Sequence, residues 1–214
     1  MAAGPEMWVP LKWQGGPLEL KRRSQNKTLP ADSALRETIG QWYDSETLDL
    51  LKGTPINCLL VTWSTGSDPE LEQQQHKLVK AYAQEARKRG IAVLGQVFPG
   101  SAISSFVEPA LDAGLEGLVL EGDFPGGERF VSEVQQALRN KNSAAVVVPV
   151  TAWESLKPSL DTPILATAEA VAPNLREFVE GVEATPSSEP WIDSNIWLVR
   201  SIRPWDRSRP IWLE

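Results

Sequence analysis

Short apolar runs that alternate with helix-like segments are the feature that most restricts the fold of this chain. Each run is about four to eight residues long and is bounded by glycine, proline or polar residues, which is typical of a buried strand. The predicted strands cover residues 7–13, 56–63, 91–98, 117–121, 145–151, 163–168, 181–185 and 210–213. Because parallel strands buried on both faces give such continuous apolar runs, the alternation predicts a parallel sheet covered by helices.

The segments between these runs have helical spacing and recognisable helix ends. We expect helices over residues 33–42, 45–51, 69–89, 101–113, 128–140, 153–160, 174–180 and 190–202. Asp68 and Pro69 mark the start of the third helix, whose buried face is expected to include Leu78 and Tyr82. Residues 14–17 are interpreted as a turn that does not open a helix, so the basic cluster at residues 21–23 is predicted to lie in a solvated loop.

Eight alternating strand and helix units predict a (β/α)8 barrel of the TIM type, with one domain over residues 1–214. The chain lies near the lower end of the usual barrel length of about 200–250 residues, and no helix follows the eighth predicted strand. The barrel is therefore expected to be small and incomplete, or to be part of a longer chain. An open doubly wound sheet is the alternative, but Gln14-Gly15-Gly16-Pro17 lacks the dinucleotide-binding fingerprint.

Composition excludes several classes of partner and site. The net charge of −7 and the lack of a basic stripe argue against nucleic acid, and no apolar stretch is long enough to predict a membrane span. No signal peptide is visible at residues 1–5, so we expect a cytoplasmic protein, or a secreted one if the N-terminus is truncated. Cys58 is the only cysteine, and the only histidine, His76, is expected to face solvent, which argues against thiolate and imidazole metal sites. Glu121 and Asp123 could ligate a divalent cation, but two nearby acids alone are weak evidence for one, so we predict no metal and no cofactor.

Aromatic, amide and carboxylate residues gather where the predicted strands end. The carboxyl ends of barrel strands form one mouth, and Glu121 and Asp123 should leave the same face of the fourth strand. The predicted catalytic residues are Glu121, Glu169 and Glu183, and the predicted substrate-binding residues are Trp13, Gln14, Trp63, Gln96, Asp123, Trp153 and Glu189. The alternative interpretation is that the strand-end tryptophans only plug the barrel and that some of the acids only complement helix dipoles.

These residue types suit a sugar ligand. A tryptophan ring stacks on the apolar face of a pyranose, and carboxylates and amides bond to its hydroxyls. Hydrolysis of a glycoside needs two carboxyl groups about 5–5.5 Å apart for retention, or about 6.5–9.5 Å apart for inversion. In that reaction Glu121 would be the general acid, and the spacing of the sequence leaves its partner open among Glu169, Glu183 and Glu189.

The arrangement resembles the TIM-barrel glycoside hydrolases and their glycoside-hydrolase-like relatives. The resemblance is carried by Glu121 after strand four, by Glu169, Glu183 and Glu189 after strands six and seven, and by a terminal Pro210-Ile211-Trp212-Leu213 strand. It implies a carbohydrate ligand or substrate. A non-catalytic barrel domain that binds a protein partner is the second hypothesis, and a lyase or aldolase barrel is the third.

Overall fold

The computed structural model describes residues 4–27, 35–151, 164–166 and 211–213. Internal contacts divide the chain into two compact units, Met1–Val148 and Pro149–Glu214, which we describe separately. The prediction of a single domain stays a prediction. Among the described residues, no helix combines the length and the apolar composition that crossing a membrane requires.

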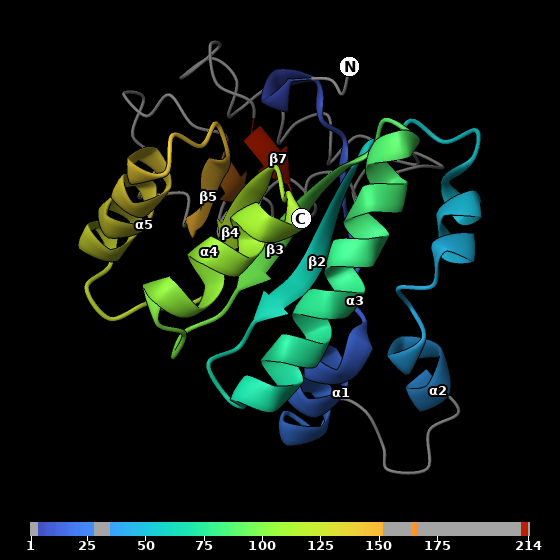
Figure 1. The fold of residues 1–214 in the computed structure, drawn as a ribbon, viewed down its shortest axis with the longest axis horizontal. Coiled ribbons are helices and arrows are strands. Elements are labelled where there is room, and N and C mark those ends of the chain that lie inside the picture. Colours follow the sequence, from blue (N-terminus) through green and yellow to red (C-terminus); the bar gives the residue numbers. More distant parts are fainter. Residues whose placement is uncertain (1–3, 28–34, 152–163, 167–210, 214) are drawn as a thin grey trace, which may run out of the picture. The chain divides into compact units, whose positions relative to one another are not determined.

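A parallel five-stranded sheet, whose fifth strand continues into the residues of the second unit, lies at the centre of the first unit (Figure 1). Its strands follow chain order, each beside the next: β1 (Pro10–Lys12), β2 (Cys58–Ser64), β3 (Ala92–Val97), β4 (Gly117–Leu120) and β5 (Val146–Thr151). The sheet curves into a half-barrel. The α/β class and the parallel pairing were therefore predicted correctly.

The predicted (β/α)8 barrel is wrong, because the described strands form a half-barrel and not a closed ring of eight. In the second unit, β6 (Ile164–Ala166) pairs in parallel with the end of β5 and with β7 (Ile211–Leu213). The predicted strand at 181–185 and the predicted helices at 153–160, 174–180 and 190–202 lie outside the described residues. Apolar runs reveal how many strands a chain can form, but closure depends on curvature and register, which the runs do not encode.

Helices follow most of the strands of the first unit. They are α1 (Gly16–Gln25), α2 (Leu35–Gly40), α3 (Pro69–Lys88), α4 (Ile103–Ala113) and α5 (Glu128–Asn140), with 3₁₀ turns η1 (Pro5–Met7) and η2 (Ser45–Leu51). The cap of α3 is confirmed, since the Asp68 side chain accepts hydrogen bonds from the backbone of Glu70 and Leu71. The predicted turn at residues 14–17 is wrong, because α1 begins there with Pro17 in its first turn.

The core of the first unit lies between the sheet and helices α3, α4 and α5, which Figure 1 shows on one face of the sheet. From α3 it takes Val79, Tyr82, Ala83 and Ala86, and from β2 it takes alternate residues including Trp63. Leu78, predicted to belong to this face, is 42% exposed. The helix turns Glu72 and Gln75 inward instead, because both bond to backbone groups at the end of β2 or just after it.

Candidate functional site

Four polar side chains from three strands meet at the carboxyl end of the sheet. We call Lys12, Gln14, Gln96 and Glu121 the Gln96 cluster. In register, Lys12 pairs with Leu60 and Thr62 pairs with Gln96. Since side chains alternate along a strand, Lys12, Gln14 and Gln96 leave the sheet on the same side. Glu121 follows β4 directly, and its backbone N–H donates to the carbonyl of Val97 at 3.0 Å.

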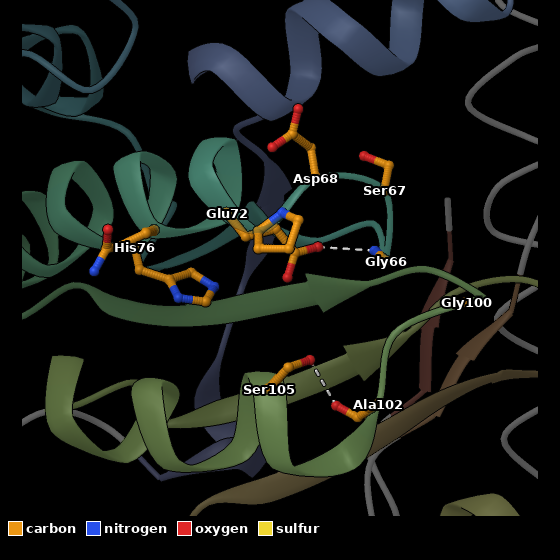
Figure 2. Close-up of a pocket in the computed structure, with 10 residues that line it drawn as sticks. Gly66, Ser67, Asp68, Glu72, His76, Gly100, Ala102 and Ser105 are labelled. Atoms are coloured by element: carbon orange, nitrogen blue, oxygen red, sulfur yellow. Dashed lines mark hydrogen bonds between the residues drawn. The ribbon is translucent and has the colours of Figure 1, made fainter.

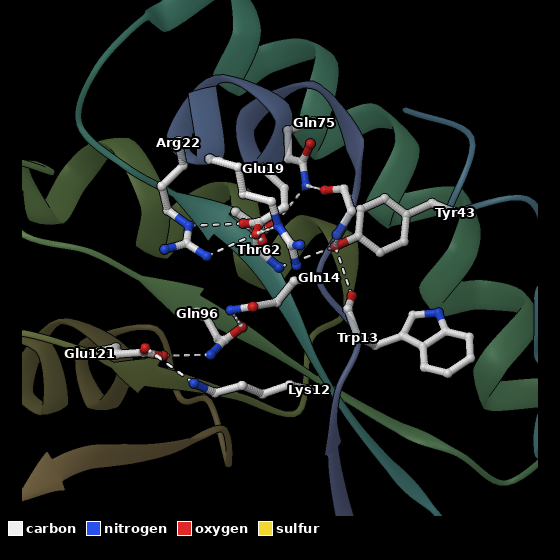
Figure 3. A network of polar contacts seen from close by, with 12 residues as sticks. Lys12, Trp13, Gln14, Glu19, Arg22, Tyr43, Thr62, Gln75, Gln96 and Glu121 are labelled. Atoms are coloured by element: carbon white, nitrogen blue, oxygen red, sulfur yellow. Dashed lines mark hydrogen bonds and ion pairs between the residues drawn. The ribbon is translucent and has the colours of Figure 1, made fainter. Parts of the chain in front are cut away.

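Hydrogen bonds join the Gln96 cluster into a continuous chain (Figure 3). Gln14 Nε2 donates to Gln96 Oε1 at 2.7 Å, and Gln96 Nε2 donates to Glu121 Oε2 at 2.6 Å. Lys12 Nζ donates to Glu121 Oε1 at 3.3 Å. Gln96 is fully buried, whereas the side chains of Lys12 and Glu121 are 29% and 24% exposed. The chain of bonds therefore runs from the interior to a solvent-accessible ion pair.

A buried ion pair on α1 lies beside this cluster. The carboxylate of Glu19 is fully buried and accepts hydrogen bonds from Arg22 Nε at 2.9 Å, Arg22 Nη2 at 2.8 Å and Arg23 Nε at 2.6 Å. Thr62 Oγ1 donates a fourth bond at 3.0 Å. Burial acts to raise the pKa of Glu19, but the bonds from both arginines outweigh it and hold the pKa below its ordinary value.

Two further side chains hold the segment between β1 and α1 in place. Gln75 Nε2 donates to the carbonyls of Gly15 and Thr62, and its Oε1 accepts from the backbone of Leu18. Gly16 has φ +79°, and a Cβ there would lie 2.3 Å from Gln75 Oε1, so glycine permits this close approach. The buried Tyr43 hydroxyl donates to the carbonyl of Trp13 and accepts from the backbone of Gly15 and Thr62. Burial raises the pKa of Tyr43.

Two of the three tryptophans predicted to bind substrate, Trp13 and Trp63, are instead packed in the core. Trp63 is fully buried, donates from Nε1 to the carbonyl of Phe106 at 3.0 Å, and stacks on His76 with ring centroids 3.9 Å apart. Trp13 is 5% exposed and packs against Trp42 at 4.8 Å. Trp63 is one residue from Thr62, so strand alternation turns it toward the helices. Neither ring is accessible for stacking on a sugar.

The remaining predicted residues divide into one exposed position and four without described structure. Asp123 is exposed in the loop that follows β4. Trp153, Glu169, Glu183 and Glu189 lie outside the described residues. Of the predicted set, the structure therefore brings Gln14, Gln96 and Glu121 together.

The predicted catalytic and substrate-binding residues did not include Lys12, Glu19 or Arg22, which lie in the same polar region. Arg22 and Arg23 had been interpreted as part of a solvated loop, and that interpretation is wrong because both belong to α1. A signal was present: Glu19 lies three and four residues before these arginines, which is the spacing of ion pairs on a helix.

A separate pocket of about 360 Å³ lies between the loop after β2 and the start of α4 (Figure 2). Its wall includes Gly66, Asp68, Glu72, His76 and Ser105. Glu72 Oε1 already accepts bonds from the backbone of Thr65 and Gly66, both at 2.8 Å. Asp68 caps α3 and also pairs with Lys21 at 3.1 Å. Both carboxylates are thus committed to the loop and the helix, which makes this pocket the weaker candidate.

His76 is half-buried in the wall of this pocket, so the prediction that it faces solvent is wrong. Its Nε2 lies 3.1 Å from the carbonyl of Trp63, which fixes Nε2 as the protonated nitrogen. Burial lowers the pKa of His76, against the opposing effects of Glu72 and of the Trp63 carbonyl. Within the described ranges, no three histidine, cysteine, aspartate or glutamate residues are grouped so that they could hold a metal ion.

Comparisons with known proteins identify no relative of this chain. The chain matches no protein family, no curated protein sequence and no solved structure. The Gln96 cluster and its surroundings are therefore the basis for assigning a function.

Proposed function

We propose that the Gln96 cluster binds a carbohydrate and that the chain is a sugar-binding protein. The observation that carries this proposal is the continuous chain of hydrogen bonds from Gln14 through Gln96 to Glu121 and Lys12, ending at partly exposed charged groups. A sugar hydroxyl both donates and accepts, and the accessible part of the cluster offers the Gln14 amide that does both, a carboxylate that accepts and an ammonium that donates. Such convergent polar groups at the carboxyl ends of parallel strands are typical of ligand sites in α/β folds.

One feature of the described residues favours binding over hydrolysis. Hydrolysis needs a second carboxyl group across the scissile bond. Glu19 is unsuited to that role, because it is fully buried and bound to two arginines. The predicted catalytic partners Glu169 and Glu183 lie outside the described residues, so the hydrolase role of Glu121 remains a proposal that depends on them.

The hypothesis of a partner-binding domain also stays a prediction. The large apolar side chains that are exposed among the described residues are Met7, Val9, Leu35, Leu50 and Leu78. They come from four separate segments of the chain, and single exposed apolar residues are normal on a protein surface.

The test is a binding measurement with variants of the cluster. The full chain is titrated with glucose, galactose, mannose and their disaccharides by calorimetry or saturation-transfer NMR. Glu121→Gln removes the charged acceptor and should weaken binding about tenfold, the effect of losing one charge-assisted hydrogen bond. Gln96→Met, of similar size, breaks the bonds by which this fully buried amide orients Gln14 and Glu121, and should also weaken binding.

Matched controls separate this effect from general damage to the fold. Glu133→Gln alters an exposed acid that pairs with Arg129 on α5, and Gln136→Met alters an exposed amide on the same helix. Both controls should bind like the wild type. If no sugar binds the wild type, or if the variants at Glu121 and Gln96 bind as the controls do, the proposal is wrong. If the wild type releases nitrophenol from nitrophenyl glycosides and Glu121→Gln does not, the chain hydrolyses glycosides as well as binding sugars.

A further inference from the structure

Arg22 is held in place by two neighbours but still has hydrogen-bonding capacity left. Its Nε and Nη2 form a two-point contact with the buried carboxylate of Glu19. Its guanidinium lies over the ring of Phe98, 4.9 Å from the centroid. Within the described part of the chain, no hydrogen bond from Nη1 accompanies these contacts, and the side chain is 28% exposed. Glu19 and Phe98 therefore orient a cation whose remaining donor is available to a ligand.

The position of Arg22 relates this donor to the proposed sugar site. The negative charge of Glu121 acts on Arg22, and Thr62, which donates to Glu19, pairs in register with Gln96. Figure 3 shows Arg22 and Glu19 on one side of the chain of bonds that joins Gln14, Gln96 and Glu121. A ligand bound to the amides and to Glu121 would thus have a fixed guanidinium nearby.

An arginine that only fastened α1 to the sheet would not need this arrangement. Arg23 Nε already donates at 2.6 Å to Glu19 Oε1, the oxygen that Arg22 Nη2 also binds, and Thr62 links Glu19 to β2. The additional two-point contact and the aromatic ring under Arg22 already order this side chain, so it loses less conformational entropy when a ligand binds. Planar guanidinium groups are especially suited to carboxylates and phosphates.

We propose that the ligand of the Gln96 cluster is an acidic sugar, and that Arg22 Nη1 binds its anionic group. This inference rests on the proposed function of the cluster. The anionic group is a carboxylate or a phosphate, since both present oxygens that a guanidinium recognises in the same way. The residues that bind hydroxyls and the residue that binds the charge are then distinct and can be tested separately.

The experiment compares three forms of the same hexose, the neutral sugar, its 6-carboxylate and its 6-phosphate, for glucose, galactose and mannose. At least one acidic form should bind the wild-type chain about tenfold or more tightly than its neutral parent, the gain expected from one strong charge-assisted bond. Whether the carboxylate or the phosphate form gains more identifies the source of the charge. Neutral forms that bind as tightly as both acidic forms would overturn the inference and leave the proposed function standing. Binding of none of the nine compounds would overturn both.

Variants then assign the charge to Arg22. Arg22→Gln should remove the preference for the acidic form, whereas Arg22→Lys should restore part of the preference. Arg129→Gln, at an exposed arginine of α5, is the control and should keep the preference. A preference that survives in Arg22→Gln would contradict the role of this residue.

A second measurement remains decisive if Arg22→Gln does not fold. Binding of the acidic sugar to the wild type should weaken between about 20 mM and about 500 mM salt, because ions screen a partly exposed charge pair, while binding of the neutral parent should not change. Equal salt dependence of the two sugars would rule out recognition of the charge.

Discussion

Glu19→Gln is expected to lower the free energy of unfolding by about 3 kcal/mol at neutral pH. The carboxylate accepts three bonds from Arg22 and Arg23, and each bond to a charged group contributes about 1.5–3 kcal/mol. The sum overestimates the loss, because the two arginine side chains are 28% and 34% exposed and regain water. Breaking a buried pair costs about 3–5 kcal/mol, and the lower end applies because glutamine keeps an acceptor for Thr62.

This difference in stability should disappear in acid. The pKa of Glu19 is lower in the folded chain than its ordinary value of 4.5, so the unfolded chain takes up the proton first. The stabilisation by Glu19 is therefore complete above about pH 4.5 and is lost as the pH falls through the pKa of the folded state. The wild type and Glu19→Gln should differ fully at pH 7 and converge at lower pH.

Urea unfolding followed by circular dichroism measures both effects, at about pH 7 and at about pH 3. Glu133→Gln is the matched control, since its pair with Arg129 is exposed and should contribute less than about 1 kcal/mol. If Glu19→Gln lost no more stability than this control, or if its deficit were the same at both pH values, the buried ion pair would not have the role that its geometry indicates.

Three other substitutions or titrations test separate parts of the first unit. Gly95→Ala should destabilise the fold by about 1–3 kcal/mol, because the new Cβ would lie 2.8 Å from Trp63. Gly40→Ala is the control and should not destabilise it, because its Cβ would meet only an ordinary contact at 3.5 Å. Equal unfolding midpoints of the two variants would contradict this packing. The only histidine, His76, should titrate by NMR below its ordinary pKa of 6.5. Its contribution to the free energy of unfolding is therefore complete above about pH 6.5 and is lost as the pH falls through the pKa of the folded state. His76→Gln should remove this dependence of stability on pH. Burial raises the pKa of the Cys58 thiol, so thiol reagents should label the native chain only as fast as it unfolds; rapid labelling would show that Cys58 is accessible.

The sequence predicted best those elements whose ends are marked by local chemistry. The bounds of α5 agree with the predicted residues 128–140, and Asp68 with Pro69 defined the start of α3. The start of α1 carries a similar mark in Pro17, but the adjacent glycines favoured a turn. Local signals of this kind depend on a few neighbouring residues, which is why a single sequence contains them.

The candidate site was predicted only in part, because its remaining features depend on contacts between distant residues. The strand ends indicated Gln14, Gln96 and Glu121, which the structure brings together. Trp63 was misplaced because one step along a strand reverses the face that a side chain occupies. Strand β2 ends at Ser64, one residue later than predicted, so Trp63 is not its last residue. Gln75 is polar and lies on a helix, and nothing near it in the sequence shows that the interior needs its amide to bond Gly15 and Thr62.

The distances along the chain that separate the members of this site have a consequence for synthesis on the ribosome. Gln75 lies 60 residues after Gly15 and 57 after Leu18, so the contacts that anchor α1 form only after the first turns of α3 have been made. Lys12 must wait 109 residues for Glu121. A nascent chain would therefore display Lys12 long before Glu121 exists, and it would acquire the proposed binding capacity only once β4 had emerged.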